Sequence, residues 1–382
     1  MPYDFDSLTK RTDSIKWHLM QQKHPDLDER AIPITIADME CMTAPEIREV
    51  LKSYLDETIL GYPFVKPTYY EAVQGWMQRR HGFSVEKDWI YPVSGIVPAL
   101  YAALSALTEP GDGVIIMPPV YFPFFSAIAA TGRREASCPL INEDEHYQID
   151  FDRFEALAAD PQNTMFILCS PHNPGGIVWS KETLCRLDDI CRRHRVTVLA
   201  DEIHHDLILP GHHHIVFQTL SPETAMNTVT CTAPSKTFNL AGLGLANLIM
   251  ANPEHLKKYD DYEEKTGFPH VNLLAFKACE LAYTHGDAWL DEAIHQIDRN
   301  RQTAEVFLKQ YFPEIKIAPL QGTYLLWIDV RELEPAQTSR FIAQDGAMFG
   351  PGGEGHLRLN LALPNRALKE QLQRFAEDYD RI

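Results

Sequence analysis

The chain has 382 residues, 45% of them hydrophobic, and a formal net charge of −18 at pH 7. Its length allows a large buried core in two domains, and its negative charge disfavours nucleic acid as a partner, because it repels phosphate backbones. No apolar run approaches the roughly 18 residues that span a bilayer, and the first residues lack a signal-peptide pattern, so we expect a cytoplasmic protein without a membrane partner.

The first informative element in chain order is a helix that starts near residue 96. Ser94-Gly95-Ile96-Val97-Pro98 opens it, and it continues through Leu104. The first N–H groups of a helix and its dipole attract anions, and a proline in the first turn removes no hydrogen bond that the helix needs. The backbone amides of Ile96 and Val97 are therefore candidate anion ligands. An ordinary capped surface helix is the alternative.

From about residue 90 to 250, short apolar strands alternate with helical stretches, which predicts a mostly parallel sheet covered by helices. The clearest strands are Gly113–Met117, Met165–Cys169, Val196–Ala200, Val229–Thr232 and Leu245–Met250. Ligands of such sheets bind beyond the carboxyl ends of the strands. Asn173, Asp201 and Lys236 each follow a strand end, so we expect one site there.

Lys236 has the setting of a reactive amine. The strand that ends at Thr232 runs into Ala233-Pro234-Ser235-Lys236, and an apolar stretch follows. A partly dry cleft would lower the pKa of the lysine towards its neutral, nucleophilic form, which can make a Schiff base. A solvated lysine is the alternative for Lys236, and a turn or helix-cap residue is the alternative for Asp201.

After about residue 280 the pattern changes to that of a smaller α+β domain. It predicts a long helix over Ala288–Phe312, strands over Thr323–Asp329 and His356–Leu361, and a closing helix from Arg366. Arg358 interrupts the second strand, where a charge is costly unless it is paired. Its guanidinium suits a bidentate carboxylate ligand, and a structural salt bridge is the alternative.

A glycine-rich stretch, two histidine clusters and the cysteine spacing are weighed as signs of dinucleotide binding, metal binding and redox chemistry, and none is favoured. Gly350-Pro351-Gly352-Gly353-Glu354-Gly355 fits G-x-G-x-x-G, but a strand follows it, so a loop is favoured over dinucleotide binding. His204-His205-Asp206 and His212-His213-His214 contain metal-ligand types, yet neighbouring strand residues point to opposite faces and the triple follows Pro-Gly, so we favour a solvated loop and no metal. The seven cysteines lack a Cys-x-x-Cys pair and predict reduced core thiols.

The order of three motifs carries a family resemblance. Asn173-Pro174-Gly175-Gly176 comes first, Asp201 follows 28 positions after Asn173, and Ser235-Lys236 ends 35 positions after Asp201. In this order the chain resembles the fold-type-I pyridoxal-phosphate (PLP) enzymes of the class I/II aminotransferase superfamily. The narrower resemblance is to the C–S lyase branch of cystathionine β-lyases and cysteine desulfhydrases. It rests on residues 11–17, Ile36-Ala37-Asp38-Met39, Gly61-Tyr62-Pro63, Asp201-Glu202-Ile203-His204 and residues 235–239.

The resemblance implies an α/β fold with a large PLP-binding domain over residues 46–280 and a small domain from residues 1–45 and 281–382. It implies that Lys236 binds the cofactor aldehyde, that Asp201 pairs with the pyridine nitrogen and that Asn173 hydrogen-bonds the 3′-oxygen. It assigns the substrate carboxylate to Arg358. Tyr121 resembles the aromatic residue that stacks on the pyridine, and core packing is its alternative.

The phosphate shell follows less directly from the resemblance. Ile96, Val97 and Ser235 are its expected donors, and Tyr62 resembles a tyrosine that reaches the phosphate of the neighbouring subunit, which implies a homodimer. A core aromatic is the alternative for Tyr62. Gly244 and Ala233 depart from the pattern, because relatives have an arginine and a serine there. Relatives have a tyrosine at the position of His204. His204 either replaces the contact of that tyrosine with the cofactor or only packs behind the cofactor ring.

The resemblance implies a β-lyase that cleaves L-cystathionine or a related L-cysteine S-conjugate to a thiol, pyruvate and ammonia. Its substrate is then a small amino acid. An aminotransferase with the same cofactor is the first alternative. A binding or regulatory protein that kept the fold is the second, and the intact Lys236, Asp201 and Arg358 disfavour it.

Overall fold

The structure is a computed structural model that describes residues 3–9, 11, 13–27, 31–267, 270–334 and 341–379, with no side-chain description for 378 and 379. Thr12, which belongs to one of the motifs above, lies outside the described residues. None of the described helices is long and apolar enough to cross a membrane. All seven cysteines are free, and five are buried, but Cys185 is exposed on a helix and Cys41 is half-buried. The prediction of core thiols is therefore wrong for Cys185.

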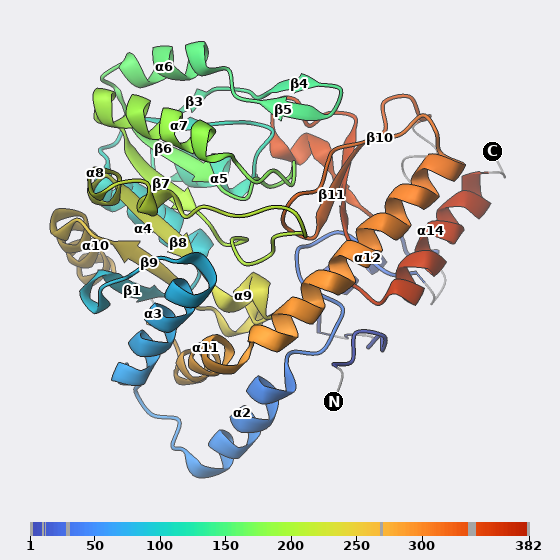
Figure 1. Ribbon diagram of the computed structural model, residues 1–382, viewed down its shortest axis with the longest axis horizontal. Coiled ribbons are helices and arrows are strands. Elements are labelled where there is room, and N and C mark those ends of the chain that lie inside the picture. The colour runs from blue at the N-terminus through green and yellow to red at the C-terminus, as the bar shows by residue number, and fades with distance from the viewer. Residues whose placement is uncertain are drawn as a thin grey trace.

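A seven-stranded sheet lies in the left half of the molecule in the view of Figure 1. Its strands are β1 (Ile90–Val93), β2 (Gly113–Ile116), β3 (Arg134–Ser137), β6 (Asn163–Cys169), β7 (Thr197–Asp201), β8 (Thr228–Thr232) and β9 (Ala246–Met250). Their order is β1-β9-β8-β7-β6-β2-β3. The five strands from β8 to β3 pair in parallel, whereas β9 is antiparallel to both neighbours. The mostly parallel sheet is confirmed.

Helices cover both faces of this sheet. The first face carries α4 (Ile96–Leu107), α5 (Pro123–Ala130) and α10 (Pro253–Thr266), and the second carries α6 (Phe151–Ala159) and α7 (Lys181–His194). Neighbouring strand residues point to opposite faces, so Ile116 packs in the first layer and Ile115 in the second. Both are fully buried, which explains why the strands read as continuous apolar runs.

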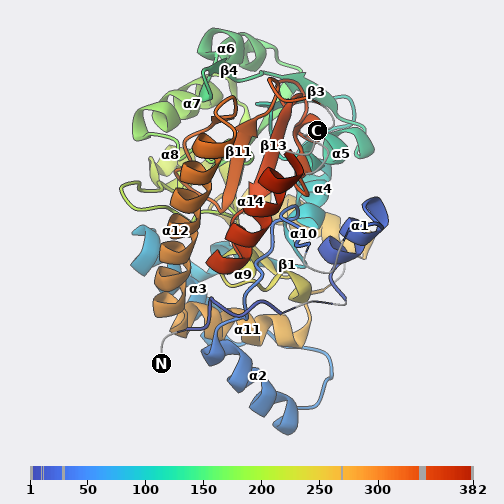
Figure 2. The same cartoon turned by 90° about the vertical axis from the view of Figure 1, so that its right-hand side faces the viewer.

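A second sheet, antiparallel throughout, lies towards the C-terminus. Its order is β10 (Lys316–Ile317), β11 (Leu325–Asp329), β13 (His356–Asn360) and β12 (Gln344–Asp345). Helices α12 (Asp287–Tyr311) and α14 (Asn365–Tyr379) lie side by side against it (Figure 2). The chain near Ile34 joins this sheet: its N–H donates to Ile342 and its carbonyl accepts from Asn360. The domain boundaries themselves stay a prediction.

The remaining elements connect these layers. They are α1 (Ile15–Lys23), α2 (Pro45–Glu57), α3 (Pro67–His81), α8 (Pro222–Met226), α9 (Pro234–Thr237), α11 (Leu273–His285) and the hairpin of β4 (Ile141–Glu143) and β5 (His146–Gln148). Helices α3 and α11 pack together, and Trp76 stacks on Tyr283 with ring centroids 5.1 Å apart. Helix α2 lies at the lower end of the molecule in both views (Figures 1 and 2).

Candidate active site

Three neighbouring parallel strands end at one pocket. In the register of the sheet, Asp201 at the end of β7 lies beside Cys169 of β6 and Cys231 of β8. The pocket beyond this edge has a volume of about 300 Å³. Nine of the ten predicted site residues line it: Ile96, Val97, Tyr121, Asn173, Asp201, His204, Ser235, Lys236 and Arg358. A larger surface groove of about 650 Å³ beside α12 contains none of them.

Lys236 enters the pocket from the short helix α9, which begins as soon as β8 ends. Pro234 occupies its first position, where no backbone donor is needed. The amine of Lys236 donates a 2.7 Å hydrogen bond to the carbonyl of Ala37. Loss of water around the amine lowers its pKa to about 8, and the nearby Asp38 carboxylate opposes this shift. Lys236 is therefore partly neutral near physiological pH.

Asp201 is 2% exposed and forms no salt bridge with any described residue, although the charge of Lys236 acts on it. Its carboxylate accepts a 3.2 Å hydrogen bond from the backbone N–H of Ile203. Burial raises its pKa to about 7, although that hydrogen bond and the charge of Lys236 act in the opposite direction. A buried carboxyl in this state favours a cationic ligand, because a positive charge would stabilise its ionised form.

Arg358 lies in β13 and is 3% exposed. It donates from Nη1 to Oδ1 of Asn173 at 2.9 Å and from Nη2 to the carbonyl of Thr35 at 3.3 Å. No carboxylate among the described residues pairs with it, so the alternative of a structural salt bridge is wrong. Its Nε has no hydrogen-bond partner, and burial lowers its pKa to about 10. The guanidinium is thus poised for a carboxylate ligand.

The start of α4 forms one end of the pocket. No cationic side chain of the described residues lines this end. Gly95 precedes the helix with φ +135°, and the buried hydroxyl of Ser94 has no hydrogen-bond partner. Gly244 lies opposite, where an added Cβ would come within 3.2 Å of the Ser94 carbonyl and φ is +60°. An arginine at this position would be strained. The donors available to an anion here are hydroxyls and backbone N–H groups of the first helical turn.

Two rings complete the walls. Tyr121 lines the pocket beside Phe122, and burial raises its pKa to about 12. His204 is 3% exposed, and its Nδ1 has no hydrogen-bond partner. Burial, and then the charges of Lys236 and Arg358, keep the pKa of His204 well below its usual value. His204 is therefore a neutral imidazole with one nitrogen available to a ligand.

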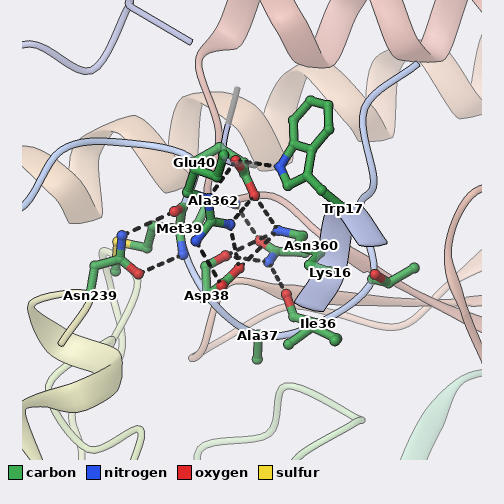
Figure 3. A network of polar contacts seen from close by, with 12 residues as sticks. Lys16, Trp17, Ile36, Ala37, Asp38, Met39, Glu40, Asn239, Asn360 and Ala362 are labelled. Carbon is green, nitrogen blue, oxygen red and sulfur yellow. Dashed lines mark hydrogen bonds and ion pairs between the residues drawn. The ribbon is translucent and has the colours of Figure 1, made fainter. Parts of the chain in front are cut away.

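The segment of residues 34–41 is a wall of the pocket to which the sequence assigned no role. Ile36 and Ala37 line the cavity. Asn360 donates to the carbonyls of Ile36 and Asp38, both at 2.7 Å, and Lys16 reaches the carboxylates of Asp38 at 3.2 Å and Glu40 at 3.0 Å (Figure 3). The motif Ile36–Met39, which the chain shares with its relatives, could have pointed to this wall. The contact itself could not be predicted, because Ala37 contacts Lys236 through its backbone carbonyl, which every residue type has.

Glu40 and Asn239 anchor the same segment at its far end. The side chain of Glu40 also accepts from Trp17 Nε1 at 3.1 Å and pairs with Arg11 at 2.5 Å. Asn239 accepts from the N–H of Met39 at 2.9 Å and donates to its carbonyl at 3.0 Å. Asn239 follows α9, so this segment is tied to the helix that carries Lys236 (Figure 3).

The geometry corrects one sequence prediction and rules out one alternative. Tyr62 is fully exposed and does not line the pocket of its own chain, so the alternative of a core aromatic is wrong. The histidines are not simply a solvated loop: His204 and His205 lie in a buried turn after β7 rather than in a strand, and His214 is 4% exposed. His212 and His213 are exposed, as expected. The G-x-G-x-x-G stretch is a loop before β13.

The fold and this pocket agree with comparisons to known proteins. The family model of aminotransferase class I and II matches residues 34–375. The chain belongs to this family. The chain is 41% identical to cystathionine beta-lyase PatB of Bacillus subtilis (strain 168). The match covers 97% of this chain and 98% of PatB. Cystalysin from Treponema denticola, solved with pyridoxal 5′-phosphate, is 40% identical and covers 100% of both chains with a TM-score of 0.97.

A further solved relative in this aminotransferase family is the PLP-bound C–S lyase from Staphylococcus hominis. It is 29% identical, covers 99% of this chain and 98% of its own, and has a TM-score of 0.91. The predicted fold, the cofactor PLP and the resemblance to the C–S lyase branch are thereby confirmed, and the chain is a PLP-dependent enzyme. The residues fit the cofactor: Asp201 lacks a cation, Ser94 lacks a partner, and Lys236 supplies a partly neutral amine.

Proposed function

We propose that this enzyme cleaves the Cβ–S bond of L-cystathionine or a related L-cysteine S-conjugate. One water is consumed overall, and a thiol, pyruvate and ammonia are released. The observation that carries the proposal is one pocket with an amine of lowered pKa, and with a carboxyl and a guanidinium that form no salt bridge with any described residue. The chain that holds it is 41% identical to a cystathionine beta-lyase.

The roles of the cofactor-facing residues follow from this geometry. When bound, PLP supplies a protonated ring that withdraws electrons from Cα of an attached amino acid. Lys236 binds the cofactor aldehyde through its amine, and Asp201 keeps the ring nitrogen protonated. The oxygen of Asn173 is taken by Arg358, which leaves its amide nitrogen to donate to the 3′-oxygen. Tyr121 packs on the ring, and His204 contacts it from the β7 side.

The phosphate lies at the start of α4 in this proposal. The amides of Ile96 and Val97 and the hydroxyl of Ser235 donate to it, and the unpartnered hydroxyl of Ser94 adds a donor that the sequence alone did not suggest. The helix dipole favours the negative charge. No cationic side chain lines this end of the described pocket, so the phosphate needs a further donor from elsewhere.

The substrate is held by its carboxylate and deprotonated by Lys236. Arg358 binds the carboxylate and thereby orients Cα towards the amine of Lys236. Once the substrate amine has displaced it from the aldehyde, the free amine of Lys236 takes the Cα proton as a general base, a role that typically contributes about 10²–10⁴-fold to the rate. Departure of the β-thiolate then completes the elimination. An aminotransferase would instead return that proton to the cofactor and would need a 2-oxoacid to complete its cycle.

Product analysis separates these two reactions. Holoenzyme is incubated with cystathionine, and with a panel of other cysteine S-conjugates, in the absence of any 2-oxoacid. A lyase releases pyruvate and thiol in equal amounts over many turnovers. Product formation that requires an added 2-oxoacid, with no thiol released, would replace the lyase by the aminotransferase.

A homodimer with shared active sites would supply the missing phosphate donor. The segment after α2 is apolar and exposed: Ile59 is 90%, Leu60 67% and Phe64 79% exposed, and Tyr62 lies between them. A contiguous exposed apolar stretch is typical of an interface. We infer that it packs on a second copy and that Tyr62 reaches the phosphate of that copy. A cytoplasmic location also stays a prediction.

A further inference from the structure

A second group of ligand-type side chains surrounds a small cavity away from the Lys236 pocket. The cavity has a volume of about 150 Å³, and its lining includes His81, His205, Asp206 and the loop histidines 212–214. His81 is the last residue of α3, whereas His205 and Asp206 lie in the turn after β7. The fold therefore brings together residues that are more than a hundred positions apart.

Two imidazoles point at one carboxylate oxygen in this cluster. Nε2 of His81 lies 2.7 Å from Oδ1 of Asp206, and Nε2 of His205 lies 3.2 Å from the same atom. The side chains of His205 and Asp206 are 0% exposed, and that of His81 is 5% exposed. All three ligand atoms lie within 4.8 Å of one another. A metal ion with bonds of about 2.0–2.2 Å would need only a small adjustment of these groups.

The hydrogen bond made by Nδ1 of His205 determines which ring nitrogen can bind a metal ion. Nδ1 of His205 lies 2.5 Å from the carbonyl oxygen of Glu202, which can only accept, so Nδ1 carries the proton. Nε2 of His205 is buried, and it makes no hydrogen bond of good geometry with any described residue. A lone pair on Nε2 that faced the carboxylate oxygen would be unfavourable, so either a proton or a metal ion lies between the two atoms. Donation of Nδ1–H to a backbone carbonyl is typical of metal-binding histidines.

The carboxylate is oriented as well. Oδ1 of Asp206 accepts from Trp76 Nε1 at 3.0 Å, and Oδ2 accepts from the hydroxyl of Thr237 at 2.7 Å. Outer hydrogen bonds of this kind fix the direction of a metal ligand. Thr237 directly follows Lys236, so the cluster also connects α3 and the turn after β7 to α9.

We propose that His81, His205 and Asp206 bind a divalent transition metal of the zinc type. Two imidazoles and one carboxylate are a zinc-type ligand set, and the fourth position, which faces the cavity, is taken by water. Each imidazole binds through Nε2 and keeps one proton on Nδ1, and a second proton carried by His205 on Nε2 beside Asp206 passes to solvent. The ion holds α3, the turn after β7 and α9 together, and it takes no part in the reaction at Lys236.

Zinc titration of the holoenzyme tests the site. Chelator-treated holoenzyme is titrated with Zn²⁺ against a chromophoric chelator, and its melting temperature is recorded with and without Zn²⁺. We expect one zinc ion per chain and a rise in melting temperature, since a ligand that binds the folded state stabilises it. Failure of the wild-type enzyme to retain zinc would overturn the proposal and would leave a proton as the cation between His205 and Asp206.

Two variants distinguish the buried cluster from the exposed loop. His205→Gln should weaken zinc binding by more than about 100-fold, above the range for loss of an outer-shell partner. The matched control, His212→Gln with His213→Gln, should keep the affinity within about threefold, because these side chains are exposed. The reverse pattern would mean that the loop alone chelates zinc and would overturn the assignment.

A spectroscopic reading covers the case in which His205→Gln folds poorly. Co²⁺ in place of Zn²⁺ should give the visible bands of a tetrahedral site, recorded as a difference from metal-free holoenzyme so that the absorption of PLP cancels. These bands should disappear in His81→Gln, whose position at the end of α3 is less buried. Octahedral Co²⁺ spectra in the wild-type enzyme would contradict a site of three protein ligands and one water.

Discussion

The amine of Lys236 donates to the backbone carbonyl of Ala37, although 199 positions separate the two residues. This hydrogen bond joins the helix that follows β8 to the N-terminal segment. It also places the reactive amine against a wall that Lys16, Asn239 and Asn360 hold from behind. The position of the Lys236 amine therefore depends on residues that lie outside the lining of the pocket.

The lowered pKa of Lys236 predicts how the apoenzyme takes up PLP. The neutral amine attacks the cofactor aldehyde, and its share rises with pH through about 8 rather than through the usual value of 10.5. The rate of PLP uptake, followed by visible absorbance, should rise across that range and then level off. Lys236→Ala should show neither the absorbance nor turnover. Borohydride labelling of that variant at the wild-type level would show that another residue binds the cofactor.

Asp201→Asn should weaken PLP binding and slow the reaction. The amide has nearly the same shape but no charge, so it cannot hold a proton on the ring nitrogen, and an unprotonated ring withdraws electrons poorly. PLP release on dilution and kcat measure the two effects. Asp189→Asn, at an exposed position on α7, is the control. Wild-type kcat in the Asp201 variant would rule out the role given to this carboxyl.

Arg358→Gln should lose most of kcat/KM, on the order of 2–5 kcal/mol, because a buried ion pair with the substrate carboxylate is lost. The loss should vanish for substrates whose carboxylate is replaced by an amide. Arg366→Gln serves as the control, since Arg366 is 88% exposed and pairs with Glu370. If the variant discriminates between acid and amide as strongly as the wild type does, the carboxylate is bound elsewhere.

Lys16→Met should destabilise the protein through the anchor of residues 34–41. Lys16 is 1% exposed and pairs with Asp38 and Glu40, so its removal leaves a buried carboxylate with too little positive charge, at a cost of about 3–5 kcal/mol. Denaturant unfolding measures the loss. Lys52→Met removes an exposed pair with Glu49 and should change stability by less than about 1 kcal/mol. An equal loss of unfolding free energy in the two variants would show that the buried ion pairs of Lys16 stabilise the protein no more than the exposed pair of Lys52.

Mixing two inactive variants tests the dimer. Lys236→Ala chains retain Tyr62, and Tyr62→Ala chains retain the lysine, so a mixed dimer would contain one complete site. Activity should reappear after the two are unfolded and refolded together. Tyr311→Ala, at another exposed tyrosine, should stay active alone. Full activity of Tyr62→Ala, or of a monomer at low concentration, would end the shared-site model.

The sequence predicted those parts of the site that depend on an unusual residue type at a given position. Asp201 ends an apolar strand, Arg358 lies within one and Lys236 follows one closely, so the unusual setting of these three charges was visible before the structure. The roles of Ala37 and Ser94 were not, because one acts through a carbonyl and the other through a hydroxyl that only burial makes notable. Strands of two residues, such as β10 and β12, are too short to show a period.

Contacts across long sequence distances account for the remaining errors. The expectation of a solvated histidine loop considered His205 only with its neighbours in sequence. His81, whose Nε2 contacts Asp206, comes from a helix 125 positions away.

The walls of the active-site pocket come from nearly the full length of the chain, from Ile36 to Arg358. During synthesis, β6, β7 and β8 emerge long before Arg358, to which we assign the substrate carboxylate. A nascent or truncated chain that ends before β13 thus has the lysine but no Arg358, and it leaves Asn173 without its partner. The pocket is therefore complete only in a chain that extends through β13.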